Sequence, residues 1–125
     1  MIAVDTSSLI AYLSGARGPD VDSVDAALAD NQVCLPPVVL TELLSDPKLP
    51  ERVASLLGQI PLLPVTDGYW DRAGTLRSKL IARKRRARLA DTLIAQICLD
   101  HDVALITRDA DFRHFAQIGS LKIVS

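Results

Sequence analysis

Short apolar runs alternate along the chain with stretches in which apolar residues recur at helical spacing. The runs at 2–4, 33–35 and 103–106 lack polar alternation, which is typical of strands buried in a parallel sheet. Residues 60–65, which include two prolines, are predicted to form a further strand or an extended edge segment, and a last strand is predicted at 121–124. Helices are predicted at 8–13, 22–29, 37–44, 50–59, from 67 to about 82, at 89–99, and through Phe112 and Phe115. This alternation predicts a three-layer α/β fold, with helices flanking a central, mainly parallel sheet of about five strands.

The composition fits one aliphatic-rich domain covering residues 1–125. Hydrophobic residues make up 49% of the chain but aromatic residues only 4%, so we expect Tyr69 and Trp70 to serve in packing. Cys34 and Cys98 lie in apolar surroundings and are interpreted as buried thiols in a reducing compartment. No apolar run approaches the ~18 residues of a membrane span, and no basic region precedes an apolar signal core. We therefore expect a cytoplasmic protein without a membrane partner.

Four carboxylates occupy places where a strand ends or an apolar helix begins. Asp5 follows the first strand, and Asp109 follows the strand at 103–106. Glu42 and Asp91 lie among apolar residues of the helices predicted at 37–44 and 89–99. Asp5 and Asp91 also suit helix starts, and Glu42 suits the rim of an apolar helix face. Because ligands bind outside the carboxyl ends of parallel strands, the four positions favour one shared site.

Four carboxylates brought into one cleft require a cation, because like charges at close range oppose ionisation. Oxygen ligands favour Mg²⁺ or Mn²⁺ over zinc, and these ions assist phosphodiester hydrolysis by activating water. The chemistry indicated is hydrolysis of a phosphodiester by metal-activated water at Asp5, Glu42, Asp91 and Asp109.

Basic residues are concentrated just before Asp91. The run comprises Arg83, Lys84, Arg85, Arg86 and Arg88. Guanidinium groups bind phosphate oxygens bidentately, so a nucleic-acid backbone is a candidate partner, whereas a solvated helix end is the alternative.

Three acids near the start of the second predicted helix are interpreted differently. Asp20, Asp22 and Asp25 suit the positive end of a helix dipole. We expect them to be solvated and to have no chemical role.

At these positions the chain resembles the PIN-domain family, particularly VapC-type toxins of toxin-antitoxin pairs. The resemblance rests on Val4-Asp5-Thr6-Ser7, on Glu42, on Asp91 in an Asp-x-x-Ile-Ala segment, and on Thr107-x-Asp109-x-Asp111-Phe112. It covers essentially the whole chain.

The resemblance implies a PIN-like fold and an endoribonuclease dependent on Mg²⁺ or Mn²⁺. It also implies a homodimer, and a cognate antitoxin that neutralises the toxin by occupying the acidic cleft. The family's acidic motif carries over onto the four acids, and Thr6, Ser7 and Thr107 are hydroxyls that orient them. Asp111 either contributes to a second metal or starts the following helix.

Other classes fit less well. Haloacid-dehalogenase-like phosphatases have an Asp-x-Asp motif after a strand, whereas this chain has Asp5-Thr6-Ser7. Receiver domains require a lysine after a late strand, and the turn after residue 106 has none. Glycine patterns for nucleotide binding are absent from the sequence. The remaining alternative is a PIN-like module that binds RNA or protein without catalysis.

Overall fold

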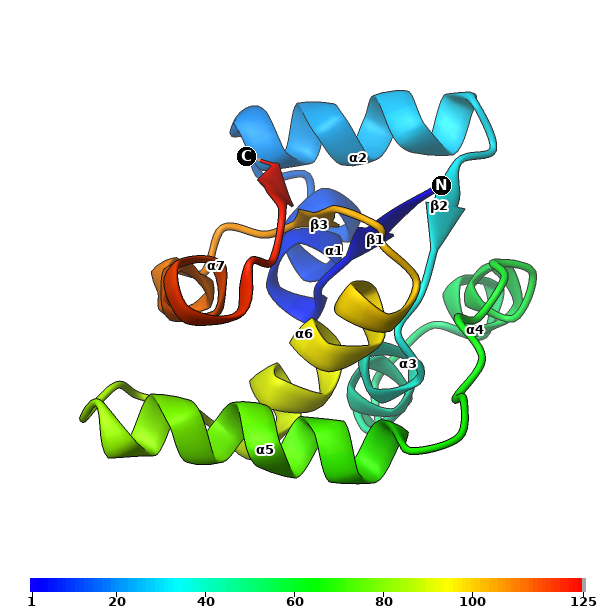
Figure 1. Cartoon of the computed structure of the whole chain (residues 1–125). Coiled ribbons are helices and arrows are strands. Elements are labelled where there is room, and N and C mark those ends of the chain that lie inside the picture. Colours follow the sequence, from blue (N-terminus) through cyan, green and yellow to red (C-terminus); the bar gives the residue numbers. More distant parts are fainter. Residues whose placement is uncertain (125) are drawn as a thin grey trace.

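Four short parallel strands form the centre of the molecule in the computed structural model, which describes residues 1–124 (Figure 1). The strands are β1 (Ile2–Val4), β2 (Val33–Cys34), β3 (Leu105–Ile106) and β4 (Ile123–Val124). Their order across the sheet is β2-β1-β3-β4, with Ala3 paired to Cys34 on one side and to Leu105 on the other. The α/β fold with a parallel sheet is therefore confirmed.

Seven α-helices and one short 3₁₀ helix surround this sheet in the described part of the chain. They are α1 (Thr6–Leu13), α2 (Pro19–Ala29), α3 (Pro37–Leu44), α4 (Glu51–Leu57), α5 (Tyr69–Ala82), α6 (Leu89–Asp100), η1 (Ala110–Phe112) and α7 (Arg113–Gly119). Helix α2 begins three residues earlier than predicted because Pro19 occupies its first turn, where a missing backbone N–H costs nothing. Among the described residues, no helix combines the length and apolarity needed to cross a membrane.

Of the two possibilities predicted for residues 60–65, the structure has the extended edge segment and not a full strand. This segment makes one isolated parallel bridge, between Leu35 and Leu62. The Leu35 amide donates to Pro61 O at 2.9 Å, and the Leu63 amide donates back to Leu35 O at 2.9 Å. Pro61 and Pro64 have no amide hydrogen to extend the ladder, so the described sheet has four strands instead of about five.

The side of the sheet to which successive strands are added changes at β1. The connection from β1 leads to β2 on one side of β1, whereas the next connection crosses back over β1 to β3, and β4 follows beyond it. In Figure 1, α2 lies on one side of the strands, and α6 and α5 lie on the other. Such a change of side opens a crevice at the carboxyl ends of the two central strands, which is where open α/β sheets bind ligands.

The core is mainly aliphatic, as expected, and both cysteines are buried and free. Tyr69 is buried, and its hydroxyl donates to Leu93 O at 2.6 Å, which fits the expected packing role. The expectation for Trp70 is wrong, because 65% of this residue is exposed. The buried stripe of α5 runs through Tyr69, Ala73 and Leu76, and Trp70 lies about 100° around the helix from it.

Candidate metal centre

The four acids predicted from the sequence line one cleft of about 250 Å³ at the carboxyl edge of the sheet. Asp5 directly follows β1, Asp109 lies three residues after the end of β3, Glu42 lies on α3, and Asp91 lies in the first turn of α6. The remaining lining residues are Thr6, Ser7, Ile10, Arg88 and Ile94. Four segments that are distant in the sequence therefore bring their acids to one place.

Asp5 is the most enclosed acid of the cleft, with 3% of its surface exposed. It caps α1 by accepting the Ser8 amide at 3.0 Å, and it also accepts the Ser7 hydroxyl at 2.9 Å and the Thr107 hydroxyl at 2.7 Å. Burial raises the pKa of Asp5, while these hydrogen bonds act in the opposite direction. The helix-start interpretation of Asp5 is thus correct, and the same carboxylate also lines the cleft.

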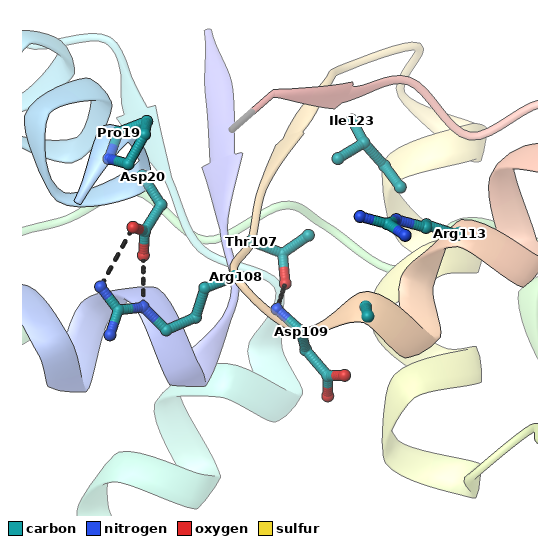
Figure 2. Close-up of a pocket in the computed structure, with 8 residues that line it drawn as sticks. Pro19, Asp20, Thr107, Arg108, Asp109, Arg113 and Ile123 are labelled. Atoms are coloured by element: carbon teal, nitrogen blue, oxygen red, sulfur yellow. Dashed lines mark hydrogen bonds and ion pairs between the residues drawn. The ribbon is translucent and has the colours of Figure 1, made fainter.

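Three hydroxyls that were predicted to orient the acids all donate to them. Besides Ser7, Thr6 donates to Glu42 Oε1 at 2.7 Å. Thr107 Oγ1 accepts the Asp109 amide at 3.0 Å (Figure 2). The same hydroxyl donates to Asp5, so this side chain joins the ends of β1 and β3. Hydrogen bonds of this kind reduce the rotational freedom of the carboxylates before any ligand arrives.

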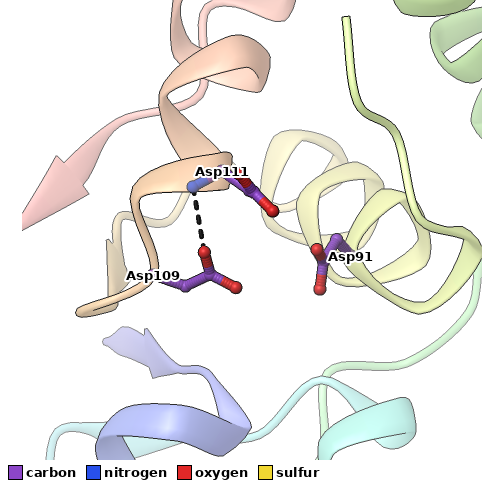
Figure 3. Close-up of side chains that lie close together, drawn as sticks. All are labelled: Asp91, Asp109 and Asp111. Carbon is purple, nitrogen blue, oxygen red and sulfur yellow. Dashed lines mark hydrogen bonds between the residues drawn. The ribbon is translucent and has the colours of Figure 1, made fainter.

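Asp91, Asp109 and Asp111 form the tightest group of carboxylates in the described chain. One oxygen from each lies within 4.8 Å of the other two, and Figure 3 shows the three side chains facing one another. The Asp111 amide donates to Asp109 Oδ1 at 2.9 Å, so Asp109 also caps η1. Asp111 therefore both starts the following helix and lies within the acidic group.

Burial raises the pKa of Asp91 to about 6, from an ordinary value of 3.8. The negative charge of Asp109 adds to this effect, the positive charge of Arg88 opposes it, and Asp5 and Glu42 contribute smaller repulsion. The site thus carries uncompensated negative charge at neutral pH.

These residues fit a divalent cation. The groups facing one another are carboxylate oxygens, the ligand type that Mg²⁺ and Mn²⁺ prefer. A cation among Asp91, Asp109 and Asp111 would relieve the repulsion that raises the pKa of Asp91.

The sequence profile of the PIN domain matches residues 2–118. The chain belongs to the PIN-domain family. No significant match occurs among curated protein sequences.

Solved structures share this fold. The chain is similar to VapBC2 from Rickettsia felis, whose structure includes a DNA fragment from its promoter. The two chains are 19% identical over 98% of this chain and 97% of that one, with a TM-score of 0.77. It is also similar to VapBC-5 from Mycobacterium tuberculosis, a toxin-antitoxin family member, with 24% identity, 98% and 96% coverage, and a TM-score of 0.69. VapBC-1 from nontypeable Haemophilus influenzae gives 22% identity, 98% and 96% coverage, and a TM-score of 0.73.

The basic run of this PIN domain is exposed, and its members differ in their position relative to the acids. Arg88 lines the cleft, and Arg86 Nη1 lies 3.7 Å from Asp111 Oδ2. Arg83, Lys84 and Arg85 close the end of α5: Lys84 has φ 58°, and the Arg85 amide donates to Leu80 O at 2.9 Å. None of these three residues lines the cleft in the described structure.

One further acid of the PIN domain was assigned incorrectly from the sequence. Asp20 is not solvated, because only 4% of its surface is exposed and it forms an ion pair with Arg108, 2.8 Å from Nε to Oδ2. It also accepts the Ser8 hydroxyl at 2.9 Å. These partners lower the pKa of Asp20 to about 2, chiefly through the hydrogen bond from Arg108. Asp20 and Arg108 are 88 positions apart, so no local pattern indicated that they meet.

Proposed function

We propose that this PIN domain is a Mg²⁺- or Mn²⁺-dependent endoribonuclease and the toxin of a type II toxin-antitoxin pair. The observation that carries the proposal is the convergence of Asp5, Glu42, Asp91 and Asp109 from four segments into one cleft. The fold shared with the VapBC proteins supports the assignment to a toxin.

The acids divide into two groups by position. Asp5, Asp91 and Asp109, with Asp111 beside them, are the residues that would hold the cation, and Glu42 completes the set on the exposed side of the cleft. When bound, the cation supplies water activation and neutralisation of charge on the phosphate. The chain's own hydroxyls, Thr6, Ser7 and Thr107, keep the acids oriented.

The substrate of the proposed reaction is the RNA backbone. Hydrolysis forms a bond from the water oxygen to phosphorus and breaks the bond from phosphorus to one ribose oxygen. A cleft carboxylate accepts the water proton, and the leaving ribose oxygen takes up a proton from solvent to become a hydroxyl. Arg88 is the guanidinium that lines the cleft, and we propose that it binds a phosphate there. Arg83, Lys84, Arg85 and Arg86 would bind the backbone further along, or an acidic segment of the antitoxin.

The proposed partners follow from the same assignment. A cognate antitoxin would neutralise the protein by placing a segment in the acidic cleft, and the toxin would act as a homodimer in the cytoplasm.

The test is cleavage of a mixed, end-labelled RNA pool by purified, antitoxin-free protein, with Mg²⁺, with Mn²⁺ or with EDTA. Wild type and the control Asp30→Asn, which changes an exposed acid outside the cleft, are expected to cut only with metal. Asp5→Asn is expected to lose cleavage while remaining folded. Cleavage that persists in EDTA, or in Asp5→Asn, would refute the proposal. RNA binding without cleavage in wild type would favour a non-catalytic module.

A further inference from the structure

The buried Asp20 forms an ion pair with the exposed Arg108 at the edge of the acidic cleft. Arg108 donates to Asp20 through Nε at 2.8 Å and through Nη2 at 3.1 Å, as Figure 2 shows. Asp20 is 4% exposed, and the pair lines a second cavity of about 220 Å³ that also includes Asp109. The two cavities therefore share one acid of the candidate metal centre.

The connection between α1 and α2 is shaped around this pair. Arg108 Nη2 also donates to the carbonyl of Arg17 at 3.1 Å. Gly18 has φ 151°, and a Cβ at this position would lie 2.7 Å from Asp20 Oδ1 and 3.1 Å from Arg108 Nη2. A side chain cannot be accommodated there without moving the ion pair, so the pair in this position requires glycine at residue 18.

Arg108 is also close to the acids that would bind metal. It lies in the chain between Thr107, which donates to Asp5, and Asp109. After Asp20, the charge of Asp5 also raises the pKa of Arg108. If the guanidinium lost Asp20, Asp5 would remain as the other carboxylate whose charge acts on it.

Asp20 is joined to Asp5 through one serine. The Ser8 hydroxyl donates to Asp20 at 2.9 Å, while the Ser8 amide donates to Asp5 at 3.0 Å. Ser8 thus links Asp20 to Asp5.

We propose that Asp20 is a positioning residue that holds Arg108 away from the cleft, so that Asp5 and Asp109 remain available to a divalent cation. The inference rests on the proposed function, because it assumes that these acids bind metal. Without Asp20, Arg108 turns to the cleft acids and competes with the cation for them. A residue that merely stabilised the loop would not act through Arg108.

The test measures Mn²⁺ affinity at pH 7.5 from the electron paramagnetic resonance signal of free Mn²⁺, using folded, antitoxin-free protein. We expect Asp20→Asn to bind Mn²⁺ about tenfold more weakly than wild type. This is the effect expected if Mn²⁺ must displace about one charge-assisted hydrogen bond from Arg108 to a cleft acid before it binds. The double variant Asp20→Asn with Arg108→Gln removes the competing charge, and its affinity is expected to return to within about threefold of wild type. Rescue by a second substitution distinguishes this role from loss of structure.

The controls separate failure of this inference from failure of the proposed function. Asp30→Asn is expected to match wild type, and Asp5→Asn is expected to weaken Mn²⁺ binding. If wild type does not bind Mn²⁺, the proposed function is refuted and this inference with it. This inference alone is refuted by either of two results, provided that wild type binds Mn²⁺ and Asp5→Asn weakens binding. The first is that Asp20→Asn binds Mn²⁺ as tightly as wild type, and the second is that the double variant binds no more tightly than Asp20→Asn.

Arg108→Gln alone gives a second test that does not depend on the folding of Asp20→Asn. The variant lacks the competing guanidinium, so its Mn²⁺ affinity is expected to equal or exceed that of wild type. Weaker Mn²⁺ binding by folded Arg108→Gln would overturn the inference.

Discussion

Replacing Asp91 by asparagine is expected to stabilise the metal-free protein at neutral pH. The Asp91 carboxylate accepts no hydrogen bond that would stabilise its charge from the described residues, and it faces Asp109 in a partly buried cleft. Asparagine has nearly the same shape and cannot ionise, so the substitution removes the unfavourable charge and leaves the packing in place.

The magnitude follows from the pKa of Asp91, which is about 6 in the folded protein against an ordinary value of 3.8. Each pKa unit corresponds to about 1.4 kcal/mol, so ionised Asp91 costs the folded state about 3 kcal/mol. Salt screens the repulsion from Asp109 but not the cost of burial, so about 2 to 3 kcal/mol is expected at physiological ionic strength.

The sign of the pH dependence is opposite to that of a salt-bridged acid. Below about pH 4 the Asp91 carboxyl is protonated in both states, and Asp91→Asn has little effect. Between pH 4 and 6 the unfolded chain ionises first, so rising pH destabilises wild type relative to the variant. Above pH 6 the full difference is reached and remains.

Urea unfolding in EDTA at several pH values between 4 and 8 measures this difference directly. Asp30→Asn serves as the exposed control and is expected to change the free energy of unfolding by no more than about 0.5 kcal/mol. A destabilised Asp91→Asn at pH 7.5, or a difference that does not vary with pH, would refute this account of the cleft.

Three further outcomes are expected. Thr107→Val removes the 2.7 Å hydrogen bond to Asp5 and is expected to weaken Mn²⁺ binding several-fold. Unchanged Mn²⁺ affinity would contradict the orienting role of the Thr107 hydroxyl. Arg88→Gln, made in a cleavage-deficient background, is expected to reduce the slope of log K against log salt concentration for single-stranded RNA binding by about 0.7, the loss of one phosphate contact. The exposed control Arg52→Gln is expected to leave this slope unchanged. Gly18→Ala is expected to lower stability by about 1 to 3 kcal/mol in urea unfolding, because its Cβ would lie 2.7 Å from Asp20 Oδ1; a stabilised variant would show that the pair moves freely.

The parts of the fold and cleft that could be predicted depend on local patterns. An apolar run followed by an acid predicts a buried strand that ends at a ligand-binding edge, and this pattern located Asp5 and Asp109. Glu42 and Asp91 stand out because each is a charge within an apolar helix. The parallel sheet then brings these positions together, as the structure shows.

The parts that could not be predicted depend on long-range contacts or on competition between local signals. Asp20 has the local features of a solvated helix start, and its partner Arg108 is 88 positions away. The segment 60–65 is apolar enough for a strand, but its prolines limit pairing to one bridge. Trp70 is exposed because the neighbouring Tyr69 occupies the buried side of α5.

The most direct test of the central claim is to locate Mn²⁺ by anomalous X-ray scattering in crystals of the antitoxin-free protein. We expect a peak in the cleft bounded by Asp5, Asp91 and Asp109, and its loss in Asp91→Asn crystals grown in the same way. A peak elsewhere, or an empty cleft at saturating Mn²⁺, would contradict the assignment of these acids as a metal centre.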